Sequence, residues 1–245
     1  MRQAVLLAGG RGTRLGPYTA NFPKPLMPLD DRMPVLELLL RQLRAAGCQE
    51  ATLAVNHFHL LLRAYFGEGE RLGLAIRYAL EAAPLGTAGP LAALLDGLDE
   101  NFLVANGDLL TTLDFRAMAV AHAASGADAT VAAVRRQEKI EFGLLELGPG
   151  TQLRGYVEKP IREDVVSIGC YLFRREALRP LLRPGAFLDM PDLIRALLAA
   201  GRDVRVHLTQ AFWLDIGRPD DYARAQAAFA AEPERFLPPG QAQPA

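Results

Sequence analysis

Strand-like and helix-like segments alternate along the first half of the chain, and this alternation restricts the fold more than any other feature. Apolar runs typical of buried strands occur at residues 3–7, 51–55, 75–79 and 102–106. The segments between them have a helical character, at residues 35–47, 59–66 and 89–98. Because a strand–helix–strand unit places its two strands parallel in one sheet, the pattern predicts an α/β domain with a parallel sheet core.

The pattern changes after residue 134. Asp114 is expected to cap a helix that runs to about Ser125, and a strand follows at residues 129–134. Strand-like segments separated by Gly, Pro and charged residues, without helices between them, then lie at 142–147, 153–159 and 165–173. They predict a mixed sheet or a small antiparallel extension. Helices are expected again at 175–182, 190–200 and 219–229, with a strand at 204–208. We therefore predict one domain over residues 1–232 and a disordered, Pro-rich tail over 233–245.

Composition excludes several classes of function. The formal net charge of the 245 residues is −1, which gives no bulk attraction to nucleic acid or to an anionic membrane surface. Cys48 and Cys170 are the two cysteines, and their spacing fits neither a zinc site nor a disulfide framework. The apolar stretch near the N-terminus is too short for a signal peptide core or a membrane span. We expect a cytoplasmic protein.

A glycine-rich stretch follows the first predicted strand, with the sequence LLAGGRGTRL at residues 6–15. Its three glycines can adopt unusual backbone angles and bring N–H groups close to phosphate oxygens, and Arg11 and Arg14 add positive charge. The dinucleotide fingerprint would need a glycine at Leu15, and the Lys-Ser/Thr of the P-loop is absent. The stretch predicts an anion cradle of another kind at the carboxyl edge of the sheet.

A lysine stands between two prolines in FPKPL, residues 22–26. Pro25 disfavours helix at Lys24, and both prolines stiffen the segment. The chain has three lysines, and two of them, Lys24 and Lys159, precede a proline. A compact ammonium held rigidly in an arginine-rich chain suggests a fixed point charge for an anion. Coincidence is the alternative.

Two aspartates follow predicted strands or apolar segments. Asp108 lies in NGDLL, residues 106–110, and Asp215 lies in WLDIGRPDDY, residues 213–222. Two carboxylates beside a triphosphate would be natural ligands of Mg²⁺, whereas a surface turn is the alternative for Asp108. The small-residue loop PLGTAG, residues 84–89, could line a nucleobase or form a simple strand-to-helix turn.

The ordered set LLAGGRGTRL, FPKPL, PLGTAG, NGD, EFG, VEKP and WLDIG, over residues 6–217, resembles the sugar-1-phosphate nucleotidylyltransferases. The resemblance implies a Rossmann-like three-layer sandwich with a mostly parallel central sheet. It also implies transfer of a nucleoside monophosphate from an NTP to a sugar 1-phosphate, with release of pyrophosphate. The motifs look most like the branch of mannose- and heptose-1-phosphate guanylyltransferases.

The same resemblance implies roles for individual residues. Catalysis would involve Arg14 at the leaving pyrophosphate and Lys24 between the two reacting phosphates. Nucleotide binding would involve Leu7, Ala8, Gly9, Gly10, Arg11, Gly12, Thr13, Gly86, Thr87 and Asn106. Sugar-phosphate binding would involve Gly143, Glu158, Lys159 and Ser167, and Mg²⁺ would be bound by Asp108 and Asp215. Ser167 belongs to Ser-Ile-Gly, where many relatives have Asn-Ala-Gly, so the sugar contacts there are open.

The expected partners are an NTP and a sugar 1-phosphate, with neither nucleic acid nor membrane, and a homo-oligomer is left open. Neither Ser167 nor Cys170 nor any of the four histidines stands in a triad-like context, so direct in-line transfer is the expected mechanism. Two other hypotheses remain: a non-catalytic relative that binds a nucleotide sugar for regulation, and a nucleotidyltransferase that uses dTTP, UTP or CTP with another sugar phosphate or a non-sugar phosphate. The sequence leaves the base and the sugar open.

Overall fold

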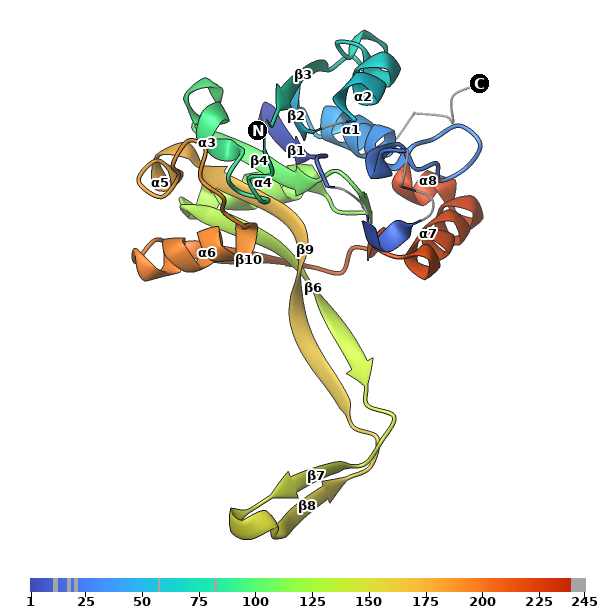
Figure 1. Cartoon of the computed structure of the whole chain (residues 1–245), viewed down its shortest axis with the longest axis vertical. Helices are drawn as coiled ribbons and strands as arrows, with labels where there is room; N and C mark the ends of the chain where they lie inside the picture. Colours follow the sequence, from blue (N-terminus) through green and yellow to red (C-terminus); the bar gives the residue numbers. More distant parts are fainter. Residues whose placement is uncertain (11–12, 17–18, 20–21, 57, 82, 239–245) are drawn as a thin grey trace.

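A seven-stranded sheet forms the centre of the computed structural model, which describes residues 1–10, 13–16, 19, 22–56, 58–81 and 83–238 (Figure 1). The strand order is β10-β6-β9-β4-β1-β2-β3. The strands are β1 (Gln3–Leu7), β2 (Glu50–Val55), β3 (Ala75–Leu80), β4 (Asn101–Asn106), β6 (Ala129–Lys139), β9 (Ile161–Arg174) and β10 (Val204–Thr209). Only β9 runs antiparallel to its two neighbours, β4 and β6, and the other neighbouring pairs are parallel. The predicted mostly parallel sheet is confirmed.

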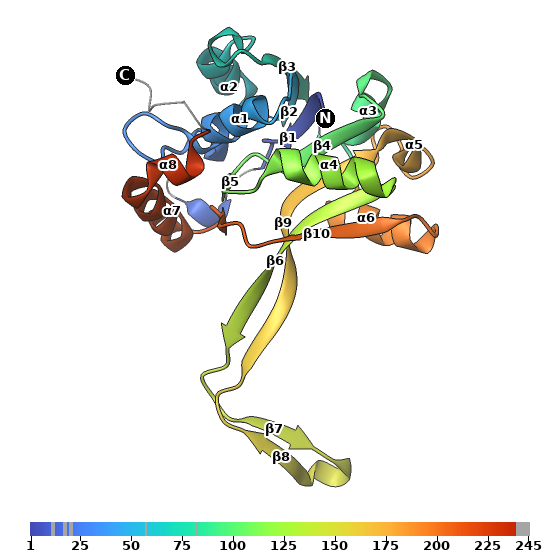
Figure 2. The same cartoon turned by 180° about the vertical axis from the view of Figure 1, so that it is seen from behind.

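Helices cover both faces of this sheet, as Figures 1 and 2 show from opposite sides. One core lies under α1 (Val35–Ala45), α2 (His59–Phe66) and α4 (Phe115–Ser125). The other lies under α3 (Leu91–Leu94), α5 (Arg175–Leu178) and α6 (Met190–Ala199). Alternation along β1 explains how one strand serves both cores, because Leu6 packs into the first and Val5 into the second. The result is a three-layer sandwich.

A third core joins the C-terminal helices to the edge of the sandwich. It contains Leu15, Leu110, Leu214 and Phe229, which come from segments far apart in the chain. The helices are α7 (Pro219–Ala231) and α8 (Pro233–Phe236), and a small antiparallel sheet of β5 (Leu109–Thr111) and β11 (Trp213–Asp215) lies beside them. Phe236 is buried in this core, so the predicted disordered tail over 233–245 is wrong for the segment that forms α8, and residues 239–245 lie outside the described residues. Pro233 is the first residue of this helical turn, a position that its fixed φ favours, and the buried Phe236 anchors the turn.

Most other predicted elements are found, with shifted ends. The strands at 3–7, 51–55, 75–79, 102–106 and 204–208 match within a residue or so, and Asp114 caps α4 by accepting a hydrogen bond from Ala117 N at 2.8 Å. The helices predicted at 89–98 and 175–182 are shorter than expected, since only α3 and α5, four residues each, are α-helical there. Within the described ranges, no helix combines the length and the apolar character that crossing a bilayer requires.

The predicted antiparallel extension is a long arm. Strand β6 continues beyond the sheet as a two-stranded ladder with the first part of β9, and β7 (Leu144–Leu147) pairs with β8 (Leu153–Val157) at its far end. We call residues 135–165 the arm; it projects away from the body in both views (Figures 1 and 2). Where the arm meets the body, the β6–β9 register shifts and Gly169 in β9 adopts a left-handed φ of 73°. The bulge redirects the ribbon out of the sheet.

Candidate active site

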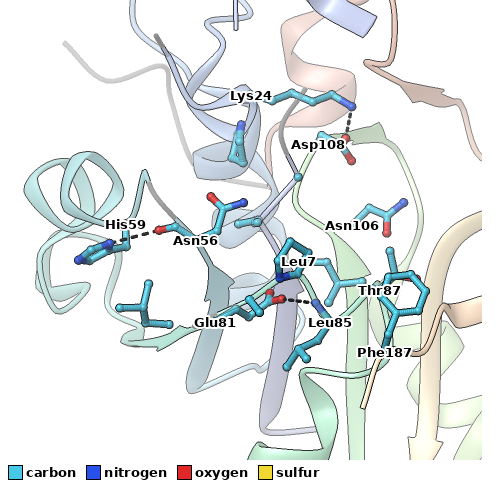
Figure 3. Close-up of a pocket in the computed structure, with 18 of the residues that line it drawn as sticks. Leu7, Lys24, Asn56, His59, Glu81, Leu85, Thr87, Asn106, Asp108 and Phe187 are labelled. Atoms are coloured by element: carbon cyan, nitrogen blue, oxygen red, sulfur yellow. Dashed lines mark hydrogen bonds and ion pairs between the residues drawn. The ribbon is translucent and has the colours of Figure 1, made fainter. Parts of the chain in front are cut away.

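A cavity of about 790 Å³ lies at the carboxyl ends of the parallel strands (Figure 3). Ligands of open α/β sheets bind at this edge, and the volume suits a small organic ligand. Ten of the residues predicted for the site line it: Leu7, Ala8, Gly9, Gly10, Arg14, Lys24, Gly86, Thr87, Asn106 and Asp108. The structure therefore brings the predicted nucleotide and catalytic residues together around one space. Arg11 and Gly12 lie outside the described residues, as does the side chain of Thr13.

The first part of the glycine-rich stretch passes close to the ends of neighbouring strands. Ala8 N donates to Ala54 O at 2.9 Å, which holds the backbone to β2 as β1 ends. A Cβ on Gly9 would lie 3.2 Å from Glu81 Oε1, whereas a Cβ on Gly10 would meet nothing within 4 Å. Gly9 thus lies where two chain segments approach closely, and the backbone of Gly10 is open to the cavity.

Lys24 is held by a short turn beside the cavity. Residues Lys24–Leu26 form a 3₁₀ turn that begins after Pro23, so the residue before Pro25 is helical there, contrary to the extended conformation that the proline favours. Pro25 and Leu26 are buried, which fixes the turn in the body. The Lys24 side chain is 11% exposed. The position of Lys24 is therefore restrained by the burial of its neighbours as well as by the rings of the two prolines.

The Lys24 ammonium lies between two carboxylates. It contacts Asp108 Oδ2 and lies 3.5 Å from Asp215 Oδ1 (Figure 3 shows the first contact). Asp108 follows β4, and Asp215 ends β11, whose pairing with β5 places Asp215 opposite Leu109. The β5–β11 ladder thus brings two acids from distant parts of the chain to one lysine.

Asp108 is the most buried acid of this group. Burial is the largest influence and raises the pKa of its carboxyl, the charge of Lys24 lowers it, and Asp215 raises it; the net result is a raised pKa. Its Oδ2 contacts Lys24, but its buried Oδ1 has no hydrogen-bond partner among the described residues. A buried carboxylate oxygen without a partner is an available ligand for a hard cation.

The two acids can hold a divalent cation only together with other oxygens. No group of three or more His, Cys, Asp and Glu side chains converges for a metal within the described parts of the chain. Mg²⁺ commonly uses one or two carboxylates and completes its shell with water and substrate phosphates. The donor set of Asp108 and Asp215, with the unpartnered Oδ1, fits such a cation when a phosphate is bound.

The loop 84–89 is fastened to the segment before α6. Gly86 has a φ of 78°, and a Cβ there would lie 2.5 Å from Leu188 O. Thr87 Oγ1 accepts a hydrogen bond from Met190 N at 2.7 Å and donates to Asp189 Oδ1 at 3.3 Å. The hydroxyl of Thr87 therefore caps α6, while the loop backbone forms a wall of the cavity.

Several lining residues were missed by the sequence analysis. Asn56 follows β2 and Glu81 follows β3, so the rule that parallel strands end at one edge could have found both. Burial raises the pKa of Glu81, although Leu85 N donates to its carboxylate at 3.2 Å. His59 Nδ1 lies 3.2 Å from Asn56 O. Phe187 stands in a loop with no periodic pattern, and no sequence signal points to it.

The predicted sugar-phosphate residues lie apart from this cavity. Gly143, Glu158 and Lys159 are on the arm, which Figures 1 and 2 show projecting away from the body. Ser167 is exposed on β9 near the base of the arm, where its hydroxyl donates to Tyr171 Oη at 3.2 Å. Beside it, a Cβ on Gly169 would lie 2.6 Å from Asn106 Nδ2, so the base of the arm adjoins the cavity lining. Within one chain, the structure does not bring the arm residues to Lys24.

Proteins of known function resemble the chain along most of its length. A mannose-1-phosphate guanylyltransferase of Mycobacterium tuberculosis is 33% identical over 229 residues, which cover 91% of this chain and 63% of that protein. The catalytic subunit beta of a mannose-1-phosphate guanylyltransferase from Xenopus tropicalis is 34% identical, covering 90% and 62%. The chain thus spans less than two thirds of the length of these relatives.

A solved structure and a family model also match the chain. HddC from Yersinia pseudotuberculosis, in a crystal structure complexed with GMP-PN, superposes with a TM-score of 0.73 at 22% identity. That match covers 94% of this chain and 100% of HddC, and it shows a shared fold. The family model described as nucleotidyl transferase matches residues 3–232, and the chain therefore belongs to the nucleotidyl transferase family.

Proposed function

We propose that the protein transfers a nucleoside monophosphate from an NTP to a sugar 1-phosphate and releases pyrophosphate. The best-supported pair is GTP with mannose 1-phosphate or D-glycero-D-manno-heptose 1-phosphate. The names of the relatives from Mycobacterium tuberculosis and Xenopus tropicalis support the base and the sugar, and the GMP-PN bound to HddC supports the base. The family membership of residues 3–232 supports the type of transfer. Because NTPs and sugar phosphates are metabolites of the cytoplasm, we place the reaction there.

The position of Lys24 carries this proposal. Its ammonium is nearly buried, is fixed by a turn, and lies at the cavity between Asp108 and Asp215. In the proposed reaction an oxygen of the sugar phosphate attacks the α-phosphorus, and the bond from that phosphorus to the pyrophosphate oxygen breaks. Both reactants are anions, so their approach is opposed by charge repulsion. A fixed cation between them reduces this repulsion and aligns the attack.

The other residues of the cavity divide between the two ends of the nucleotide. Backbone groups of Leu7, Ala8, Gly9 and Gly10, with Gly86, Thr87 and Asn106, would hold the nucleoside and phosphates. Arg14 would stabilise the departing pyrophosphate, and its guanidinium lies near the backbone of Gly217 at the cavity. Arg11, Gly12 and Thr13 belong to the same proposed cradle on the strength of the sequence motif alone.

Asp108 and Asp215 are the proposed ligands of Mg²⁺. The unpartnered Oδ1 of Asp108 and the partly exposed carboxylate of Asp215 support this assignment. When bound, the cation would supply further neutralisation of phosphate charge. Lys24 contacts the same two acids, so it would be held in place by the groups that also hold the metal.

The described cysteines and the buried histidine favour direct transfer without a protein nucleophile. Burial raises the pKa of Cys170 to about 12 and that of Cys48 to about 11, so both thiols stay protonated. His122 is held between Thr130 Oγ1 at 2.7 Å and Asn101 Oδ1 at 3.1 Å and does not line the cavity. His59 lines the cavity, but its Nδ1 lies 3.2 Å from the backbone oxygen of Asn56, and among the described residues it faces no acid that would activate it there. Transfer in a single in-line step is therefore the mechanism we propose.

A matrix of substrates tests the activity. The protein is incubated with Mg²⁺, each of GTP, dTTP, UTP and CTP, and each of mannose, heptose, glucose and N-acetylhexosamine 1-phosphate, and pyrophosphate release is measured. We expect the highest rate with GTP and mannose or heptose 1-phosphate. Release with none of the pairs would refute the transfer reaction. Tight binding of a nucleotide sugar without turnover would instead support a regulatory relative.

Replacing Lys24 by Met tests the role of the ammonium. We expect a loss of about 10²–10³-fold in kcat, with a much smaller change in the Kd for GTP, because the charge acts where the phosphates react. Arg224→Met is the matched control, since it removes an exposed cation on α7 that pairs with Asp221. Equal losses in turnover and in GTP affinity would contradict the assigned role.

A further inference from the structure

A polar cluster in the arm, between the β6–β9 ladder and the β7–β8 pair, is arranged as a binding site although the arm projects away from the body of its own chain. Tyr156 Oη donates to Glu158 Oε2 at 2.8 Å and so fixes this carboxylate. Gly143 has no side chain where a Cβ would collide with the Tyr156 hydroxyl. Lys159 adopts a left-handed φ of 45°, a strained conformation for a residue with a side chain, and such strain clusters at functional sites.

The arm holds this cluster away from the body by regular pairing. Residue pairs from Arg135–Val165 to Lys139–Ile161 form a continuous antiparallel ladder, and Ile140 N donates to Pro160 O at 3.0 Å. With about 3.3 Å per residue, five such steps carry Lys139 roughly 16 Å beyond the last residue of β6 that pairs with β10. Glu158 and Lys159 lie past that point. Reaching the cavity of the same chain would require bending the ladder back on itself.

Apolar side chains along the arm lie open to solvent. In the β7–β8 pair, Leu144 is opposite Val157, Leu145 is opposite Tyr156, and Leu147 is opposite Leu153. All six are exposed, from 43% for Val157 to 64% for Leu147. Phe142, at 78%, and Ile161, at 63%, continue the exposed surface along the arm. An isolated two-stranded ribbon is at best marginally stable in water, and an apolar surface of this extent marks a contact with another protein.

The arm leaves the sheet at the edge where the cavity opens. Strand β6 runs parallel to β4 and β1, since both β4 and β6 are antiparallel to β9 and β4 is parallel to β1. The carboxyl end of β6 therefore points to the same side as the glycine loop and Asp108. A second copy related by a two-fold axis and facing this edge would receive the arm, and would extend its own arm in return.

We propose that two copies of this chain exchange arms, so that Glu158 and Lys159 of each copy complete the sugar-phosphate half of the other copy's cavity. This inference rests on the proposed function. The cavity of one chain offers Lys24 and Arg14 as cations, and Lys24 already contacts two acids. Lys24 is the one lysine among the described residues that line the cavity, and Lys159 on the arm offers a second ammonium for the acceptor phosphate, beside the Glu158 carboxylate at 4.0 Å.

A second copy is the occupant that the surfaces favour. Leu80 and Phe187 line the cavity and are 59% and 64% exposed, so the mouth that would receive the arm is itself apolar. An apolar ribbon from another copy would cover them and be covered by them. In a two-fold dimer the contact between the arm and the cavity mouth is made twice, so the exposed apolar residues of both copies are covered.

Mixed dimers test whether the arm acts on the other copy. Lys24→Met damages the cavity, and the double variant Glu158→Gln/Lys159→Met damages the arm. The two are co-expressed with different affinity tags and purified in tandem, so that only mixed dimers remain. Each variant alone is expected to be inactive. The mixed dimer is expected to recover about half of the wild-type rate, because one of its two cavities receives an intact arm.

The matched control pairs two cavity variants, Lys24→Met with Asp215→Asn, and is expected to stay inactive as a mixed dimer. Recovery with the first pair and none with the control supports arm exchange. No recovery with the first pair, when the wild type is active, means that the arm serves its own chain and refutes the inference. Full activity of the arm variant by itself would refute it as well.

Molar mass gives a readout that does not depend on activity. Light scattering is expected to give twice the chain mass of 26.6 kDa for the wild type, and a monomer for the double variant Leu145→Glu/Leu147→Glu. Far-UV circular dichroism and thermal melting check that this variant keeps its fold, since both leucines lie outside the three cores. A monomeric wild type, or a double variant that remains a dimer, would overturn arm exchange even if the proposed reaction failed.

Discussion

Glu37→Gln tests how strongly one buried carboxylate ties α1 to the segment before β3. The Glu37 side chain is 1% exposed and accepts hydrogen bonds from Arg41 Nη2 at 2.7 Å, Arg71 Nη2 at 2.7 Å and Tyr65 Oη at 2.8 Å. Burial is the largest single influence and raises its pKa, but these donors together outweigh it and hold the pKa of Glu37 below its ordinary value. The glutamine keeps the shape and removes the charge.

The expected loss follows from what remains buried. Removing one partner of a buried ion pair typically costs about 3–5 kcal/mol. Arg71 is 44% exposed and can be rehydrated, so we expect about 2–3 kcal/mol of unfolding free energy to be lost at pH 7. For a chain of this size the melting temperature would fall by roughly 5–10 °C. Glu68→Gln, which breaks the exposed pair with Arg63, is the control and should cost less than about 0.5 kcal/mol.

Urea unfolding followed by far-UV circular dichroism at several pH values measures both the size and the origin of the effect. A carboxyl whose pKa is lowered on folding stabilises the protein above its unfolded pKa of about 4.3, and loses this contribution as the pH falls through the folded pKa. The difference in unfolding free energy between the wild type and Glu37→Gln should therefore be largest at neutral pH and shrink below about pH 4. A loss no larger than that of Glu68→Gln, or a difference unchanged in acid, would refute the reasoning.

Two further predictions concern the glycine at the base of the arm and the thiols. Gly169→Ala should lower the melting temperature and raise KM, because its Cβ would lie 2.6 Å from Asn106 Nδ2. Gly126→Ala is the control: its φ of 66° is similar but the space around it is open, so the melting temperature should fall without a change in KM. Equal KM values for the two variants would contradict this prediction. Cys48 and Cys170 should resist a thiol reagent at pH 8 until the protein is unfolded, because burial raises their pKa values to about 11 and 12; rapid labelling of the native protein would disprove it.

The sheet and most of the cavity could be predicted because their signals are local. Buried parallel strands are continuous apolar runs, and the rule that their carboxyl ends share one edge is enough to place the glycine loop and Asp108 together. The strands β5 and β11 were missed, since three residues are too few to show a period. The shortened helices α3 and α5 show tertiary packing overriding a helical pattern.

The direction of the arm could not be predicted from the sequence. The segments 142–147 and 153–159 were recognised as strand-like, and β7 and β8 lie within them. Pairing within a ribbon, however, does not state whether that ribbon lies against the body or extends from it. That choice depends on the bulge at Gly169 and on whatever surface covers the apolar ladder, and neither leaves a periodic signal.

The small β5–β11 sheet makes the site depend on the order in which the chain is made. Lys24 and Asp215 are 191 residues apart in sequence, and they meet only when β11 has paired with β5. Synthesis from the N-terminus delivers the glycine loop, Lys24 and Asp108 long before Asp215, and closing so long a loop is a late step. A growing chain therefore contains the glycine loop, Lys24 and Asp108 before Asp215 is present. The proposed active site is complete only when β11 has been made and has paired with β5.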